Sequence, residues 1–95
     1  MKNNRTYEQI ISLLNSYGHK KIIDLRLPEE YAQGHLAGSV NIPFTEISTV
    51  QGFILDLNTP IFLYCQSGKH SRSAKDVLRY LGYRYVFDIG GVALP

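Results

Sequence analysis

Residues 61–64 read Ile-Phe-Leu-Tyr, an uninterrupted apolar run of strand length, and Cys65 follows directly. Such a run is typical of a strand buried on both faces, as in a parallel sheet covered by helices on both sides. Residues 20–25 and 85–89 predict two further strands, and residues 38–43 predict a very short one closed by Pro43. We therefore expect a sheet with residues 61–64 at its centre.

Helices are predicted between these strands, because apolar residues recur three to four positions apart. Thr6 and Gln9 fit a capping box at the start of the first helix. The predicted helices cover residues 7–14, 29–33, 47–57 and 71–81. Helix and strand alternate with short connections, and parallel neighbours need crossover connections. The expected fold class is α/β, a small parallel sheet flanked by helices on both faces.

The composition fits one compact soluble domain. The chain has 95 residues, 44% hydrophobic and 19% charged, which suffices for one core and is too short for two ordinary domains. We interpret residues 1–95 as a single domain whose C-terminal element, after Gly90 and Gly91, is short or truncated. The net charge of +2 indicates neither a nucleic-acid partner nor a membrane surface. The sequence has no secretory leader pattern and no apolar run of about 18 residues, so the expected location is cytoplasmic.

Cys65 is the single cysteine, which excludes an internal disulfide, a multi-cysteine zinc site and a Cys-x-x-Cys redox pair. It is predicted at the carboxyl end of a strand, where functional groups collect in open α/β sheets. The small residues that follow suit a cradle of backbone N–H groups, and a helix N-terminus favours a thiolate. The competing interpretation is a small buried hydrophobic residue at a strand end.

Two stretches of the chain resemble the single-domain rhodaneses, the thiosulfate-type sulfurtransferases. Residues 61–73 resemble the active-site strand and loop of the family, and Leu81-Gly82-Tyr83 and Gly90-Gly91 fall where the family has similar residues. The densest match is to the N-terminal signature of the family, in the segments Asp24-Leu25-Arg26, Glu30-Tyr31, Gly34-His35-Leu36, Gly38-Ser39 and Asn41-Ile42-Pro43. The resemblance covers nearly the whole chain and implies a rhodanese-like fold.

The resemblance implies that Cys65 is a nucleophile that takes a sulfane sulfur from a donor such as thiosulfate and becomes a persulfide. An acceptor such as cyanide or a thiol then removes the sulfur, which is covalent catalysis in two steps. A sulfur-relay protein is a further candidate partner. Neither a metal nor an organic cofactor is implied. The residues implied to cradle the persulfide are Gln66, Ser67, Gly68, Lys69, His70 and Ser71.

The loop departs from the pattern Cys-Arg-Ser-Gly-x-Arg-Ser that is frequent in the family, because Gln66 and His70 replace the two arginines. The less basic loop weakens the case for efficient use of the thiosulfate dianion, although Arg72 is a candidate to supply the missing charge. Two alternatives follow: a sulfur carrier without turnover, and a module that binds a partner. Phosphatase chemistry is disfavoured, because Ser71 stands where related phosphatases have arginine.

Other polar residues suit structural roles. Asp24, Arg26 and Glu30 fit an ion pair that pins a loop better than an acid–base pair. His35 lacks a second metal ligand at suitable spacing and is interpreted as a hydrogen-bonded scaffold residue. Gly90-Gly91 is too weak a signal for a nucleotide-binding loop.

Overall fold

The computed structural model of the chain describes residues 6–92 and 94. The first five residues and parts of the predicted C-terminal element, Ala93 and Pro95, lie outside the described residues. Four parallel strands form one sheet in the order β2-β1-β3-β4. They are β1 (Lys21–Asp24), β2 (Ser39–Asn41), β3 (Ile61–Cys65) and β4 (Val86–Gly91). The predicted α/β class is confirmed, with residues 61–64 in an inner strand.

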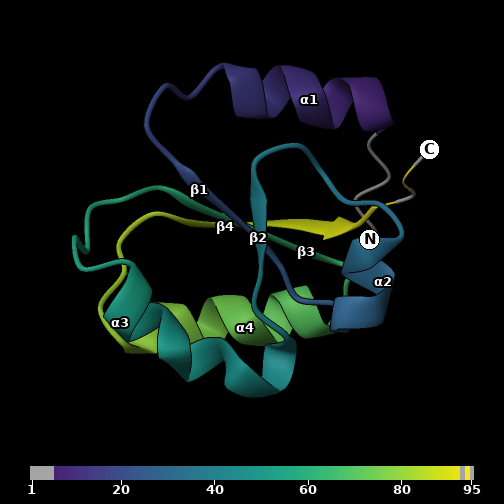
Figure 1. Ribbon diagram of the computed structural model, residues 1–95. Helices are drawn as coiled ribbons and strands as arrows, with labels where there is room; N and C mark the ends of the chain where they lie inside the picture. Colours follow the sequence, from purple (N-terminus) through teal and green to yellow (C-terminus); the bar gives the residue numbers. More distant parts are fainter. Residues whose placement is uncertain (1–5, 93, 95) are drawn as a thin grey trace.

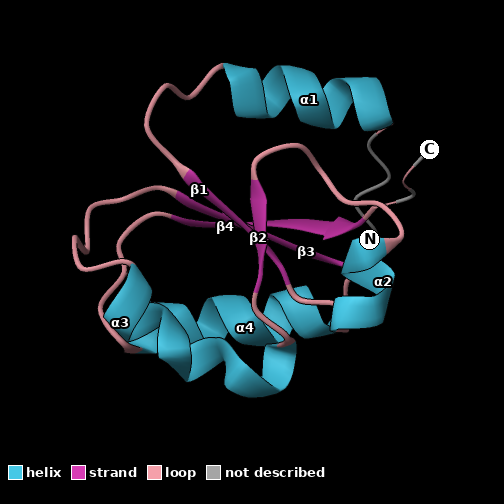
Figure 2. Cartoon of the chain, viewed as in Figure 1, coloured by secondary structure: helices cyan, strands magenta, loops and turns pink. Residues whose placement is uncertain are grey.

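Helices cover both faces of this sheet (Figure 1). The helix α1 (Tyr7–Asn15) lies on one face, and the segments η1 (Phe44–Thr49), α3 (Val50–Phe53) and α4 (Lys69–Tyr80) lie on the other (Figure 2). The short helix α2 (Pro28–Ala32) follows β1. Within the described residues, no helix has the length and apolar character that crossing a membrane requires.

The side chains of β3 alternate between two hydrophobic cores, and all five of its residues are buried. Ile61, Leu63 and Cys65 belong to the core beneath α4, whereas Phe62 and Tyr64 belong to the core beneath α1. Alternate residues of a strand point to opposite faces, so a strand covered on both sides is apolar throughout. This double burial explains the unbroken Ile-Phe-Leu-Tyr run.

The predicted capping box at Thr6 is confirmed by two reciprocal hydrogen bonds. The Gln9 N–H donates to Thr6 Oγ1 over 3.1 Å, and the Thr6 N–H donates to Gln9 Oε1 over 2.8 Å. These bonds satisfy two N–H groups that a helix start leaves without partners. The start of the first helix was therefore predictable from its capping residues.

The helix predicted at residues 47–57 is wrong in its extent. The chain forms the 3₁₀ segment η1 and then α3, which ends before Ile54, a residue with extended backbone angles. Ile47, Val50 and Ile54 do pack into the core, whereas Leu57 is exposed. The buried hydroxyl of Tyr83 donates to the Ile54 carbonyl over 2.6 Å. The apolar spacing therefore predicted which residues are buried, but not where the helix ends. The Ile54 carbonyl, just after that end, accepts its hydrogen bond from Tyr83, a residue far away in the sequence.

Two further boundaries differ from the prediction. The last strand begins at Val86 and runs to Gly91, whereas Tyr85, predicted as its first residue, precedes it with an exposed side chain. The helix predicted from Ser71 begins at Lys69, so Lys69 and His70 belong to its first turn and not to a loop. Gly68 precedes it at φ +88°, a left-handed conformation that favours glycine. Because no side chain caps this helix, its start lacks the polar capping residue by which a helix start is usually predicted.

Candidate active site

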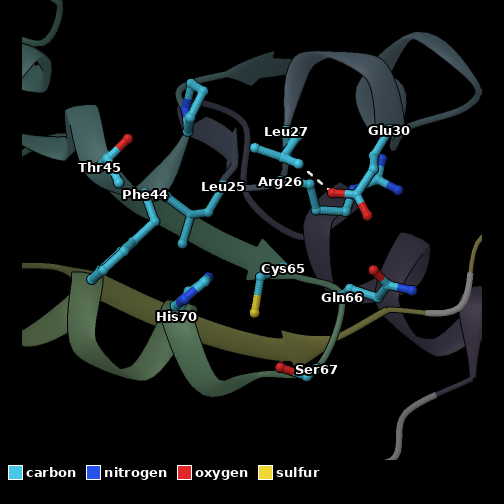
Figure 3. Close-up of a pocket in the computed structure, with 11 residues that line it drawn as sticks. Leu25, Arg26, Leu27, Glu30, Phe44, Thr45, Cys65, Gln66, Ser67 and His70 are labelled. Atoms are coloured by element: carbon cyan, nitrogen blue, oxygen red, sulfur yellow. Dashed lines mark hydrogen bonds between the residues drawn. The ribbon is translucent and has the colours of Figure 1, made fainter.

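Cys65 is the last residue of β3, and its side chain is 3% exposed. Its Sγ accepts a hydrogen bond from the Gly68 N–H, with 2.9 Å between nitrogen and sulfur. The sulfur lies between Ser67 and the first turn of α4, with His70 beside it (Figure 3). The first turn of a helix has N–H groups without helical acceptors, and the helix dipole adds a partial positive charge there. This environment suits an anion bound at the sulfur.

A cavity of about 400 Å³ opens beside Cys65. Three connections between elements contribute to it: the segment after β1, the start of η1, and the segment from β3 into α4 (Figure 3). Its lining residues are Leu25, Arg26, Leu27, Glu30, Pro43, Phe44, Thr45, Cys65, Gln66, Ser67 and His70. The cavity therefore lies beyond the carboxyl ends of parallel strands, where open α/β sheets bind ligands.

The structure divides the predicted cradle residues into three groups. Gln66, Ser67 and His70 line the cavity, and the Gly68 backbone contacts the sulfur. Ser71 is fully buried, and its Oγ donates to the Gly68 carbonyl over 3.1 Å, so its hydroxyl supports the loop. The side chains of Lys69 and Arg72 are exposed and do not line the cavity. The charges of Lys69 and Arg72 are therefore not part of the cavity lining.

The glycine pair at the end of β4 holds the Cys65 loop, defined as residues 66–68. A Cβ atom on Gly91 would lie 2.6 Å from the Gln66 carbonyl oxygen, closer than real Cβ contacts. A Cβ on Gly68 would lie 3.1 Å from the Gly91 nitrogen. This packing role of Gly90-Gly91 was not predicted from the sequence. Glycine inside a strand, which often marks close backbone approach, was the available signal.

Apolar side chains form one wall of the cavity. Leu25 is buried at the end of β1, while Leu27 is 59% exposed near the opening. The Phe44 ring stacks on the His70 imidazole, with 4.6 Å between ring centroids and 2° between planes. We call Leu25, Leu27, Pro43 and Phe44 the apolar wall. These residues line the cavity together with Cys65 and offer no hydrogen-bonding side chain.

A mostly buried ionic network adjoins the cavity, because Arg26 both lines the cavity and pairs with Asp24. Arg26 Nη2 is 2.8 Å from Asp24 Oδ2 and 2.6 Å from the Gly34 carbonyl oxygen. The Tyr64 hydroxyl donates to Asp24 Oδ2 over 2.6 Å and accepts the Leu36 N–H. Burial, and then the bond to Asp24, raises the pKa of Tyr64 to about 12. The side-chain hydrogen bond to Asp24 raises the pKa of Arg26 further above its ordinary value, against an opposing effect of burial.

This network confirms the interpretation of Asp24 and Arg26 as an ion pair that pins a loop. Glu30 has a different task, because its carboxylate accepts the Leu27 N–H over 3.0 Å at the start of α2. His35 is exposed, stacks on Tyr31, and holds Nδ1 2.7 Å from the Tyr31 carbonyl oxygen, as expected of a scaffold residue. Within residues 6–92 and 94, no three His, Cys, Asp or Glu side chains group as a metal site would need.

Comparison with known proteins identifies the architecture. The family model of the Rhodanese-like domain matches residues 6–93, almost the whole chain. The chain belongs to the rhodanese family. The thiosulfate sulfurtransferase PspE of Escherichia coli is 38% identical to this rhodanese over 77 residues, which cover 77% of this chain and 74% of PspE. Against several other curated relatives, the matched part spans about three fifths of their length.

Solved structures agree with this assignment. A structure described as a rhodanese with anions from E. coli has a TM-score of 0.73 and 36% identity, covering 80% of this chain and 94% of that one. The human single-domain sulfurtransferase TSTD1 has a TM-score of 0.73 and 26% identity, covering 98% of this chain and 93% of the human one. The expected rhodanese-like fold is therefore confirmed.

Proposed function

We propose that this rhodanese is a sulfurtransferase in which Cys65 carries the transferred sulfur as a persulfide, and that residues 1–95 act as one domain. The observation that carries the proposal is the Gly68 N–H bond to Cys65 Sγ at the floor of an open cavity. Relatives named as thiosulfate sulfurtransferases support the reaction class. A sulfur donor and a thiophilic acceptor would use the cavity in turn.

In the first step, the Cys65 thiolate attacks the terminal sulfur of the donor. With thiosulfate, a bond forms between Sγ and that sulfur, and the sulfur–sulfur bond of the donor breaks with its electron pair leaving on sulfite. The balance is Cys–S⁻ plus S–SO₃²⁻ giving Cys–S–S⁻ plus SO₃²⁻. The N–H groups of the first turn of α4 lie where they would stabilise the negative outer sulfur of the persulfide.

In the second step, an acceptor takes the outer sulfur. Cyanide attacks it, the persulfide bond breaks, and the electron pair returns to Sγ, so that Cys–S–S⁻ plus CN⁻ gives Cys–S⁻ plus SCN⁻. Neither step needs an external oxidant or reductant, because the sulfur is transferred as a neutral atom and each bonding electron pair stays on the group that leaves. The buried position of Cys65 limits access to its sulfur to molecules that enter the cavity.

The test is the mass of the intact protein after incubation with thiosulfate and removal of the excess. We expect an adduct of about 32 Da, one sulfur atom, that cyanide removes as thiocyanate. The Cys65→Ser variant should acquire no adduct and lose turnover by more than about a thousandfold, because a hydroxyl cannot store the sulfur. Equal thiocyanate formation by the variant and the natural protein would refute the proposal.

A second candidate is a sulfur carrier that forms the persulfide without appreciable turnover of free thiosulfate, with a sulfur-relay protein as its partner. The positions of Lys69 and Arg72 outside the cavity lining favour it, since inorganic dianions then meet less positive charge. A stable adduct that cyanide removes only slowly would support the carrier. Rapid catalytic turnover would support the enzyme.

A further inference from the structure

The helix α4 concentrates positive charge that the rest of the chain does not share. It contains Lys69, Arg72, Lys75 and Arg79 against the single carboxylate of Asp76, a formal charge of +3 with histidine neutral. The whole chain has a formal charge of only +2, so the residues outside α4 are together slightly negative. The positive charge of this protein is therefore localised on one helix.

The four cations share one side of α4. They are spaced three, three and four residues apart, and residues at such spacings are neighbours on a helix surface. The opposite side of the helix packs into one of the two cores. Ten residues separate the first cation from the last, which corresponds to about 15 Å along the helix axis. We call Lys69, Arg72, Lys75 and Arg79 the basic ridge.

Contacts within the protein do not neutralise the basic ridge. Across residues 6–92 and 94, the one ion pair joins Arg26 and Asp24, so no described carboxylate pairs with a ridge cation. Lys69 stands in the first turn of α4, which contains no acidic residue. A cation near a helix N-terminus opposes the helix dipole and does not stabilise the helix. The ridge therefore leaves its positive charge available to another molecule.

The basic ridge begins beside the candidate active site. Lys69 follows Gly68, whose N–H contacts Cys65 Sγ, and precedes His70, which lines the cavity (Figure 3). The remaining ridge cations extend from there along α4. A molecule bound along the ridge would therefore have one of its ends next to the cavity that leads to Cys65.

The other exposed side chains of this helix favour a protein over a nucleic acid as the bound molecule. Asp76 is exposed, four residues after Arg72 and three before Arg79, and its carboxylate repels a continuous run of phosphates. Tyr80 is 89% exposed and follows Arg79, and both residue types are enriched at the binding hot spots of protein interfaces. Separate carboxylates of a protein segment can pair with cations on either side of Asp76.

We propose that the basic ridge is the docking surface for an acidic segment of the protein that accepts the sulfur, which brings the acceptor thiol to the cavity beside Cys65. This inference rests on the proposed sulfurtransferase function and adds the surface and the charge by which the acceptor is recognised. The acceptor thiolate attacks the outer sulfur of the persulfide, and the electron pair of the broken bond returns to Cys65 Sγ. Cys–S–S⁻ plus R–S⁻ gives Cys–S⁻ plus R–S–S⁻, with equal charge on both sides and no co-reactant.

The first test loads Cys65 with sulfur from thiosulfate and follows the loss of the adduct of about 32 Da by intact mass. The acceptors are cyanide and two peptides, each with a terminal cysteine and a glycine spacer, followed by glutamates in one and glutamines in the other. At low ionic strength, we expect the second-order rate constant of the glutamate peptide to exceed that of the glutamine peptide by at least about tenfold. At about 0.5 M salt the two should agree within about twofold, because salt screens exposed charges.

Two outcomes of this test would overturn the docking surface and leave the sulfurtransferase intact. One is equal rate constants for the two peptides at low ionic strength, and the other is transfer to cyanide without transfer to either peptide. Failure of Cys65 to take up sulfur, or of all three acceptors to remove it, would overturn both proposals.

The second test asks whether the ridge causes the preference. Arg72→Ala combined with Arg79→Ala should lower the ratio of the two peptide rate constants by about fivefold or more, while the cyanide reaction changes by less than about threefold. Alanine is a strong helix former, so these substitutions preserve α4. The matched control, Lys20→Ala combined with Arg84→Ala, removes the same charge outside α4 and should keep the ratio within about twofold. An unchanged ratio in the ridge variant, or an equal fall in the control or with cyanide, would refute the assignment.

The third test reverses the charge and compares the two kinds of partner. Arg72→Glu combined with Arg79→Glu should invert the preference, so that a lysine peptide of the same design reacts faster than the glutamate peptide. In the natural protein, a glutamate peptide without cysteine should inhibit transfer to its cysteine-containing twin more strongly than an oligothymidylate of equal charge. Failure to invert, or stronger inhibition by the oligothymidylate, would contradict an acidic protein as the partner.

Discussion

Two segments leave the same edge of the sheet, one after β1 and one after β3, and they are held in opposite ways. The segment after β1 is fixed by side chains: Asp24, Arg26 and Tyr64 share a buried network, and Asn41 Nδ2 donates to the carbonyls of Asp24 and Arg26. The Cys65 loop is instead fixed by its backbone, through Gly68, Gly91 and the start of α4.

The difference shows that side-chain hydrogen bonds hold one of these segments and close backbone packing holds the other. The polar side chains after β1 are hydrogen-bonded to one another and to the backbone, and the described residues contain no buried side-chain nitrogen or oxygen without a partner. In the Cys65 loop, backbone contact replaces side-chain contact, so N–H groups remain near the sulfur for an anion. The network fixes the segment after β1 through side chains, whereas the Cys65 loop keeps the Gly68 N–H in contact with the sulfur.

The largest expected effect on stability comes from breaking the network. Asp24→Ala would leave the half-buried Arg26 guanidinium without its carboxylate and the Tyr64 hydroxyl without its acceptor. We expect the free energy of unfolding, measured in urea, to fall by about 3–5 kcal/mol. Asp76→Ala, an exposed carboxylate on α4, is the control and should change it by less than about 0.5 kcal/mol. A loss below about 1 kcal/mol in Asp24→Ala would mean that the pair acts like a surface ion pair.

The next effect comes from the glycine contact on the other side. Gly91→Ala should force the Cys65 loop to move, because the new Cβ would lie 2.6 Å from the Gln66 carbonyl oxygen. We expect a loss of about 1–3 kcal/mol and a slower reaction of Cys65 with iodoacetamide. Gly52→Ala is the control, since nothing lies within 4 Å of its added Cβ in α3, and about 0.5–1 kcal/mol of stabilisation is expected there. An unchanged alkylation rate in Gly91→Ala would show that the packing of Gly91 does not affect the reactivity of the Cys65 thiol.

A pH effect reports on the burial of Tyr64 and on its bond to Asp24. The folded chain favours the neutral phenol of Tyr64, whose pKa rises from 10.0 to about 12. The unfolded chain therefore loses this proton first, so the contribution to stability is complete below pH 10 and is lost as the pH rises toward 12. Tyr64→Phe should reduce stability at pH 7 by about 1–2 kcal/mol and flatten the decline between pH 10 and 12. Urea midpoints across that range measure it, with the exposed Tyr80→Phe as control. Parallel curves for Tyr64→Phe and the natural protein would contradict the assignment.

The smallest effect is expected at the exposed cations of α4. Lys69→Ala and Arg72→Ala should each change stability by less than about 0.5 kcal/mol, as is usual for surface substitutions. Their kcat/KM for thiosulfate at physiological ionic strength should change less than about threefold, because salt screens exposed charges that lie outside the cavity. A tenfold loss in either variant would place its side chain in the site.

Much of the fold was predictable because its signals are local. The Thr6 capping box, the double-faced β3 run and the apolar stripe of α4 each act within a few residues, and each prediction was confirmed. The helix at residues 47–57 was predicted wrongly, since its end depends on Tyr83, about 30 residues away in the chain. The start of α4 was missed for a related reason: Gly68 replaces a polar cap.

The sequence by itself determined a parallel sheet covered on both faces and a cysteine at the carboxyl end of its inner strand, because hydrophobic periodicity and strand length are local properties. Only the tertiary structure decided which side chains meet that cysteine. It left Lys69 and Arg72 outside the cavity lining, placed the Phe44 ring on the His70 imidazole, and packed Gly91 closely against the loop. Such contacts join segments far apart in the chain, and they depend on strand register and on the faces of packed helices.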